Sequence, residues 1–417
     1  MKPKSKSSLA ARACLGAAIV AVPSVLHGQS ADAVRLERLE KENKELKQRF
    51  DSLENLATKE GIMPGAAEKK MVSAMSDITI NGFVQSSYFY DTSTPGDRVS
   101  NAYLWNASHN SFSINKVKLT IASAPVERSG DSWGAGFRTS LIWGEDAPNL
   151  NTGGAVQAFD ELREAYVELN APLGTGLNIK AGQLISLLNW ESGDGGAANP
   201  NFSQGNQWWF TGNGPSAGVQ LGYAFSDTVS LNARVQNGMF AGPFDANDGK
   251  AVIASLGFKP NDKLWANLIG WYSEETPTLD VAGLSVIGGY QVSEKFGTGF
   301  EADYFNFDTA GGADSDLWSL GGWAWYDFST KVGIALRADY VNNPDGVLGP
   351  PMRGGASAIT TTDPDGDLMS LTLTLNYKPA PNVKIQPEIR FDHSGYKNGF
   401  DGKENRVIVG AGITYLF

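Results

Sequence analysis

Residues 369–391, MSLTLTLNYKPAPNVKIQPEIRF, decide the fold of this 417-residue chain. Apolar residues occupy every second position from Met369 to Tyr377 and again from Val383 to Phe391. Successive side chains of a β-strand point to opposite faces, so this period of two predicts strands with one apolar and one polar face. The break at Pro379–Asn382 predicts a tight link between two such strands.

The same alternation recurs throughout residues 77–417. Clear examples are Val229–Val235, Phe300–Tyr304 and Val332–Tyr340. A soluble antiparallel sheet alternates in the same way, because one face meets the core and the other meets water. The alternation therefore predicts an all-β region but leaves open whether it is a soluble sheet or a membrane barrel.

The lengths of the links between strands separate these two folds. Short links are expected at Val126–Asp131, Leu173–Gly176, Ser226–Thr228, Pro260–Lys263, Ser293–Lys295, Ser329–Lys331 and Pro379–Asn382. Longer links are expected at 188–213, 238–248, 308–315, 343–365 and 394–403. Short and long links alternate without a break, as in transmembrane barrels with tight periplasmic turns and long outer loops. We therefore expect a transmembrane antiparallel β-barrel of about 16 strands, with both chain ends on the short-turn side.

The end of the chain supports the barrel. Apolar residues fall on one face at Val407, Val409, Ala411, Ile413, Tyr415 and Phe417, and the last residue is itself aromatic. Soluble chains commonly end in frayed polar residues. Further aromatic residues near the expected strand ends resemble the aromatic girdles of outer-membrane barrels: Tyr223, Phe258, Tyr290, Tyr340, Tyr377 and Phe391.

Composition excludes several other classes of protein. The chain is 41% hydrophobic, 11% aromatic and 19% charged, which argues against a disordered chain. No apolar run approaches the roughly 18 to 20 residues that a membrane-spanning helix needs. The net charge of −11 argues against a nucleic-acid partner.

Residues 1–30 are expected to form a secretory signal peptide. Lys2, Lys4 and Lys6 give a basic start, the apolar run Ala13–Val22 follows, and small or polar residues come next at Gly28–Ser30. Cleavage would remove Cys14, the single cysteine of the chain. The exported chain would then fold without disulfide bonds.

Residues 32–58 carry three heptads and predict a coiled-coil helix. The a positions are Leu36, Asn43 and Phe50, and the d positions are Leu39, Leu46 and Leu53. Neighbouring g and e positions carry opposite charges at Arg35–Glu40, Glu42–Lys47 and Arg49–Glu54. We expect a parallel homo-oligomer about 35 Å long, although a single amphipathic helix with i,i+4 pairs would show a similar pattern. Residues 59–76, with Gly61, Pro64 and Gly65, are expected to form a linker.

Taken together, the signal peptide, the heptads and the barrel ending in Tyr-Leu-Phe resemble a trimeric Gram-negative porin. Within that class, Asn199-Pro-Asn-Phe-Ser203 after Gly182-Gln183, and Val235-Gln-Asn-Gly238, resemble the OmpL-like β-barrel porin family. The resemblance implies an outer-membrane homotrimer with its helix in the periplasm. The phosphate-selective porin family shares this layout but places rows of Arg and Lys along its pore. No row of one sign is evident here.

A barrel of about 16 strands is too wide for side chains to fill, so its polar face is expected to line a water-filled channel. The expected inward charged residues are Lys116, Lys118, Arg138, Glu164, Glu168, Lys180, Arg234, Glu301, Asp303, Arg337, Asp339, Lys384, Glu388 and Arg390. Opposed charged walls would set up a field across the pore. Alternatively, these residues pair across strands and only solvate the wall.

The long link 188–213 is the strongest candidate for a segment that narrows the pore. It contains Trp190, Glu191, Asp194, Asn199, Asn201, Trp208, Trp209 and Phe210. Long loops of this kind can fold inward and attach to the barrel wall. The same residues would also suit a contact between subunits outside the barrel.

The sequence gives little support for catalysis, a metal or a cofactor. The three histidines are His27, His109 and His393, and no nucleophile elbow accompanies His109-Asn110-Ser111. Asp363-Pro-Asp-Gly-Asp367 resembles a calcium loop but lacks its distal Glu, so a solvated acidic turn is expected. We expect a non-enzymatic protein.

Two kinds of function remain. The first is an outer-membrane porin for passive diffusion of small polar solutes and ions, with lipid around it. The second is a structural barrel tethered to periplasmic material through its coiled coil. A phosphate- or anion-selective porin is a variant of the first.

Overall fold

The computed structural model describes residues 78–100, 105–150, 161–240, 247–312, 314–343, 366–395 and 399–417, with residues 41, 44 and 245. The expected signal peptide (1–30), linker (59–76) and all six heptad positions lie outside the described residues, as does most of Asp363–Asp367. None of the helices in the described part of the chain is long and apolar enough to cross a membrane.

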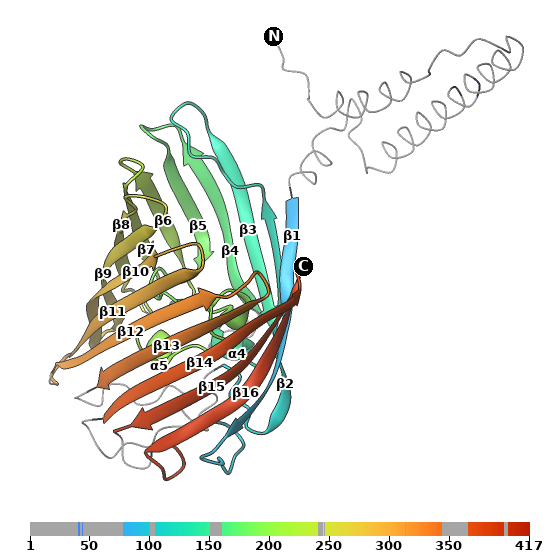
Figure 1. Cartoon of the computed structure of the whole chain (residues 1–417). Helices are drawn as coiled ribbons and strands as arrows, with labels where there is room; N and C mark the ends of the chain where they lie inside the picture. The colour runs from blue at the N-terminus through green and yellow to red at the C-terminus, as the bar shows by residue number, and fades with distance from the viewer. Residues whose placement is uncertain are drawn as a thin grey trace, which may run out of the picture. The chain divides into compact units, whose positions relative to one another are not determined.

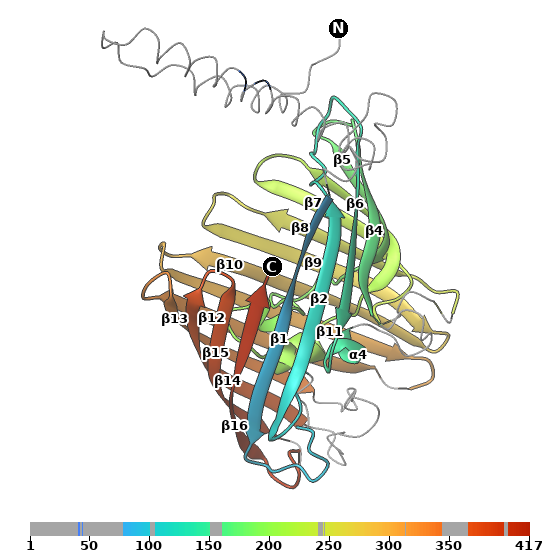
Figure 2. The same cartoon turned by 90° about the vertical axis from the view of Figure 1, so that its right-hand side faces the viewer.

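The chain forms a closed antiparallel barrel in which each strand pairs with the next along the sequence and β1 pairs with β16 (Figures 1 and 2). The strands are β1 (Ile78–Asp91), β2 (Ser111–Ser123), β3 (Gly134–Trp143), β4 (Leu162–Ala171), β5 (Leu177–Leu184), β6 (Ser216–Ala224), β7 (Val229–Gln236), β8 (Ala251–Phe258), β9 (Leu264–Thr276), β10 (Leu279–Gln291), β11 (Phe296–Thr309), β12 (Ser315–Asp327), β13 (Val332–Asn343), β14 (Gly366–Ala380), β15 (Val383–Ser394) and β16 (Asn405–Leu416). The expected all-β barrel of about 16 strands is confirmed.

The two mouths of the barrel differ in their links. At the mouth where β1 begins and β16 ends, the links run from 124–133 after β2 to 381–382 after β14, and all seven expected short links fall there. At the other mouth, the links include 92–110, 144–161, 185–215 and 344–365. The expected alternation is wrong at one place, because β9 and β10 join through residues 277–278 alone. Thr276 and Leu279 still pair there, so the hairpin stays closed to its tip.

The two faces of each strand differ as the alternation predicts. In β14, the outward side chains of Leu371 and Leu373 are 47% and 43% exposed, whereas the inward Thr372 and Thr374 are fully buried. An apolar outer band of this kind is stable in the hydrocarbon core of a membrane, because exposing apolar side chains to lipid costs no free energy, whereas exposing them to water does.

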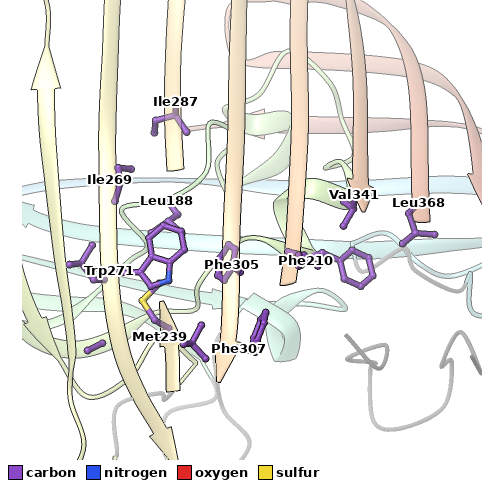
Figure 3. Close-up of a cluster of buried hydrophobic side chains, with 14 of the residues drawn as sticks. Leu188, Phe210, Met239, Ile269, Trp271, Ile287, Phe305, Phe307, Val341 and Leu368 are labelled. Carbon is purple, nitrogen blue, oxygen red and sulfur yellow. The ribbon is translucent and has the colours of Figure 1, made fainter. Parts of the chain in front are cut away.

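Part of the inner wall is apolar, which differs from the expected polar lining. Ile269, Val281, Phe305 and Leu317 lie inward on β9 to β12 and are fully buried. Figure 3 shows Ile269 and Phe305 among the side chains of this cluster. They belong to one cluster with Leu188 and Phe210, which come from residues 185–215 between β5 and β6. Residues 185–215, the inward link from here on, exclude water from this part of the wall and so favour apolar residues there.

The last residue closes the barrel. The backbone N–H of Gly82 donates to the carbonyl oxygen of Phe417 at 3.0 Å, and the N–H of Phe417 donates back to Gly82 at 3.0 Å. A Cβ atom on Gly82 would lie 2.0 Å from the carbonyl oxygen of Lys118 in the neighbouring strand β2. The closing strand β1 therefore needs a glycine at this position.

We predict that Gly82→Ala weakens the closed barrel. The added methyl group would push β1 away from β2, at a cost of about 1 to 3 kcal/mol in the free energy of unfolding. The measurement is the temperature at which the compact form is lost on semi-native gels. Gly96→Ala is the matched control, because nothing lies within 4 Å of a Cβ atom there. Equal transition temperatures for both variants would contradict the prediction.

Candidate functional site

The inward link crosses the interior of the barrel and attaches to the wall opposite its origin. It contains two short helices, η3 (Gly195–Ala197) and α5 (Asn206–Phe210). The backbone N–H of Trp190 donates to Glu301 at 2.8 Å, and that of Phe202 donates to Glu388 at 2.9 Å. Of the two arrangements that the sequence left open, the structure has the inward one.

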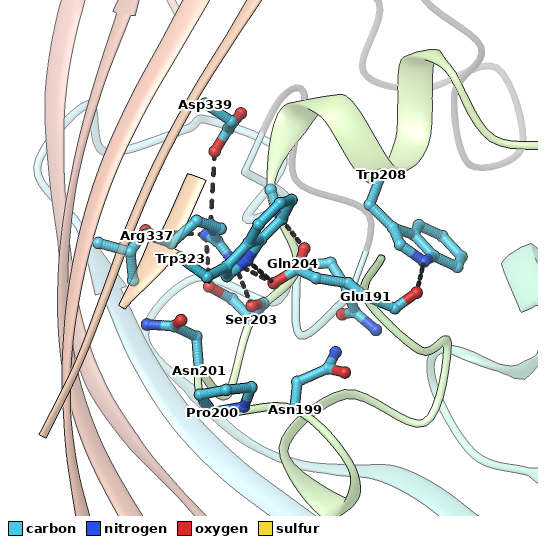
Figure 4. Close-up of polar contacts among 12 residues, drawn as sticks. Glu191, Asn199, Pro200, Asn201, Ser203, Gln204, Trp208, Trp323, Arg337 and Asp339 are labelled. Atoms are coloured by element: carbon cyan, nitrogen blue, oxygen red, sulfur yellow. Dashed lines mark hydrogen bonds and ion pairs between the residues drawn. The ribbon is translucent and has the colours of Figure 1, made fainter. Parts of the chain in front are cut away.

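Arg337 on β13 holds the centre of this attachment (Figure 4). Its guanidinium group is fully buried and pairs with Glu191 of the inward link at 3.0 Å. It also donates to the backbone carbonyl of Ser203 and, at 2.8 Å, to Thr372 on β14. A buried charge is tolerated only when it is paired and hydrogen-bonded, and Arg337 satisfies this condition with groups from both the link and the wall.

Glu191 is the partner that the inward link supplies. Its carboxylate accepts hydrogen bonds from the backbone N–H of Gly205 at 2.8 Å and from the indole of Trp323 at 3.1 Å. Burial raises the pKa of Glu191 above its ordinary value, while the charge of Arg337 and these hydrogen bonds oppose the rise. Glu191 therefore joins the link to both β12 and β13.

A second chain of ion pairs runs along the inner wall beside this attachment. Arg390 on β15 lies 2.5 Å from Asp392, and Arg406 on β16 lies 2.8 Å from Asp392 and 3.2 Å from Asp91 on β1. Arg390 also donates to the carbonyl oxygen of Gln204 at 2.8 Å. This chain of alternating charges ties the closing strands of the barrel to the inward link.

The charged residues expected to line the pore all occupy inward positions, but most are covered by the inward link. Those that contact the link are Lys118, Arg234, Glu301, Asp303, Arg337, Asp339, Lys384, Glu388 and Arg390. Lys116 is buried against Asp146 at 3.0 Å. For these residues, pairing within the protein is what the structure shows.

The remaining expected residues form a less covered wall on β3 to β5. Arg138 lies 2.6 Å from Glu164, and its side chain is 36% exposed. Lys180 lies 3.8 Å from Glu168, with side chains 26% and 21% exposed. Asp194 of the inward link faces this side too, 2.8 Å from Lys118, and is 22% exposed. The wall of β3 to β5, which we call the mixed-charge wall, carries both signs.

Sequence reasoning missed several members of these networks. Asp392 and Arg406 are absent from the expected set, because Asp392 directly follows the alternating stretch Val383–Phe391 and Arg406 directly precedes the stretch that begins at Val407. Asp91 is the last residue of β1 and Asp146 lies in the link after β3, where alternation gives no signal. The sequence points to the carboxylates and Trp residues of the inward link, but nothing in their spacing identifies Arg337 as the partner of Glu191.

His109 has a structural role. Its Nδ1 atom accepts a hydrogen bond from the backbone N–H of Asp91 at 3.0 Å, and its ring packs against Tyr90 at 4.9 Å. In the described ranges, no three His, Cys, Asp or Glu side chains are arranged to hold a metal ion.

The fold of this chain is similar to that of several outer-membrane proteins of known structure. The chain is similar to the anion-selective porin from Comamonas acidovorans at 11% identity and a TM-score of 0.54, over 82% of this chain and 99% of that one. It is similar to the outer membrane channel DcaP of Acinetobacter baumannii at 14% identity and a TM-score of 0.51, over 82% and 97%. It is also similar to a loop L8 deletion mutant of OmpT from Vibrio cholerae, at 11% identity and a TM-score of 0.53, over 82% of this chain and 99% of that one.

These identities show a shared fold. No curated protein sequence matches the chain. The model of the family described as "Putative beta-barrel porin-2, OmpL-like" matches residues 77–417, which is most of the chain. The chain therefore belongs to this OmpL-like family of β-barrel porins.

Proposed function

We propose that the barrel is an outer-membrane porin through which small polar solutes and ions diffuse between the inward link and the mixed-charge wall. The observation that carries this proposal is the asymmetry of the attachment. Most of the contacts of the link are with β11 to β15, and it reaches β2 through the ion pair of Asp194 with Lys118. Arg138, Glu168 and Lys180 on β3 to β5 keep partly exposed side chains. A polar, water-accessible wall of this kind is what a diffusion channel requires.

The mixed-charge wall favours a channel without strong preference for one ion sign. Arg138 and Lys180 are balanced by Glu164, Glu168 and Asp194 along the same side. Opposite charges at close range orient a polar solute but do not concentrate one kind of ion. A phosphate-selective channel would need a one-signed row, so we do not favour that alternative.

We further propose that the protein is a homotrimer whose residues 32–58 form a periplasmic coiled coil behind a cleaved signal peptide, and that it has no catalytic activity. The heptads support self-association. A trimer form is recorded for OmpT of Vibrio cholerae, which is similar at 10% identity and a TM-score of 0.50 over 82% of this chain and 99% of that one. Strand β1 begins at the short-turn mouth, which faces the periplasm in barrels of this class.

The detergent-extracted mature protein is expected to give stable current steps in a planar lipid bilayer, because the proposed passage beside the mixed-charge wall would connect the two mouths with water. Steps in groups of three would support the trimer. A folded, heat-modifiable barrel that never conducts would overturn the proposal and favour a structural tether.

We predict that Arg337→Met frees the inward link. The substitution leaves the buried Glu191 carboxylate without its counter-charge, at a cost of about 3 to 5 kcal/mol in the free energy of unfolding. Single-channel recordings should show a larger or flickering conductance. The double variant Arg337→Met/Glu191→Gln should regain part of the stability, since it removes both charges. Unchanged current and stability in the single variant would show that the link is held by other contacts.

Ion preference is expected to depend on the mixed-charge wall. Replacing Arg138 and Lys180 together by Gln removes two positive charges beside the passage, so the reversal potential in a KCl gradient should shift toward cations. The shift should be larger near 0.1 M salt than near 1 M, where the screening length falls from about 10 Å to about 3 Å. Lys259→Gln, in an exposed turn, is the control. A shift of equal size in the control would show that the mixed-charge wall does not determine the ion selectivity.

A further inference from the structure

We propose that three tryptophans of the inner wall and one of the inward link form a binding strip for the ring face of a neutral sugar. The tryptophan strip consists of Trp265 on β9, Trp323 and Trp325 on β12, and Trp190 of the inward link. The inference rests on the proposed porin function, because it names a class of solute that the channel would carry.

The strip lies toward the short-turn mouth of the barrel. Trp265 is the second residue of β9, and Trp325 stands two residues before the end of β12. Trp265 shares its face with Ile269 and Trp271, which lie in the interior cluster. Although it points inward, Trp265 remains 36% exposed. Trp265 therefore keeps part of its ring open at this end of the barrel, whereas Trp323, which is 4% exposed, is covered and supports Trp190.

Glycines of β10 and β11 form the floor of the strip. A Cβ atom added to Gly289 would lie 2.6 Å from the indole nitrogen of Trp265. One added to Gly297 would lie 2.2 Å from Trp325, and one added to Gly299 would lie 2.3 Å from Trp190. The rings of Trp265, Trp325 and Trp190 therefore lie against backbone that carries no side chain.

Strand register makes the strip continuous. Trp265 pairs with Gly289, Gly289 pairs with Gly299, and Gly299 pairs with Trp323 across neighbouring strands. Trp190 stacks on Trp323 with ring centroids 4.6 Å apart and planes at 19°, and lies 5.8 Å from Trp325. The hydrogen bond from Trp323 to Glu191 fixes the strip to the attachment of the inward link.

The surroundings of the strip fit a sugar ring better than an apolar or charged solute. A sugar presents C–H groups on its ring faces and hydroxyl groups at its rim. Flat indole surfaces suit the ring faces. The neutral amide of Asn267, two residues from Trp265, can serve the hydroxyl groups. Gln291 can accept through its Oε1 atom, since its amide nitrogen already donates to the carbonyl oxygens of Ser293 and Phe296. No basic residue takes part in the strip itself.

The test uses the full mature protein in a bilayer, with maltotriose as the probe and sorbitol, which has no ring, as its control. Maltotriose should interrupt the ion current at concentrations where sorbitol does not. Trp265→Ala and Trp325→Ala should each raise the apparent dissociation constant about tenfold. Trp265→Phe should restore part of the binding, and the outward Trp318→Ala on β12 should leave it unchanged.

Failure of the inference and failure of the porin function give different results. A channel that conducts KCl but responds equally to maltotriose and sorbitol, or keeps full maltotriose binding in both Ala variants, overturns the strip alone. A barrel that does not conduct overturns the porin function. In that case, protection of tryptophan fluorescence from acrylamide by maltotriose in detergent still tests the strip, and equal quenching with and without the sugar would reject it.

Discussion

Within a hydrocarbon layer every backbone N–H and C=O group must find its partner in the protein, and the rest of this structure depends on that constraint. The chain satisfies it by pairing each strand with the next and then β16 with β1, so that no strand edge remains. Closure fixes which face of each strand meets lipid and which meets the interior. The outward leucines of β14 and its inward threonines follow directly from it.

Closure also creates an interior that strands alone cannot fill, and the inward link supplies the missing contents. Its apolar residues Leu188 and Phe210 complete a core with the wall, and Glu191 supplies the charge that Arg337 needs. Arg337 would be costly without the link, and the link would have no fixed place without Arg337. The wall and the link are therefore best regarded as one packed unit, with the uncovered mixed-charge wall left for solutes.

The sequence predicts the strands well because a register error of one residue would turn every lipid-facing side chain inward. The sequence does not predict whether the link 185–215 folds inward, since tryptophans and carboxylates are equally suited to a contact inside the barrel and to a contact between subunits. The sequence also does not predict the apolar part of the inner wall. Ile269 and Phe305 fall on the face that elsewhere carries polar residues, and their contact with Leu188 and Phe210 explains why they are apolar. Likewise, nothing local predicts that Glu191 meets Arg337, because the pairing depends on the three-dimensional path of the link.

The pairing of β1 with β16 has a further consequence for how the chain must fold. Gln85 and Thr414 touch across this seam although 329 positions separate them, and the closing bonds use the final residue, Phe417. Contacts so distant in sequence form slowly, because a long loop of chain must first lose its freedom. Until β16 is in place, β1 has no partner on one side and remains an open edge, which favours unwanted pairing with other chains. The barrel therefore cannot close before β16 has been made, and the unfinished barrel needs protection until β16 pairs with β1.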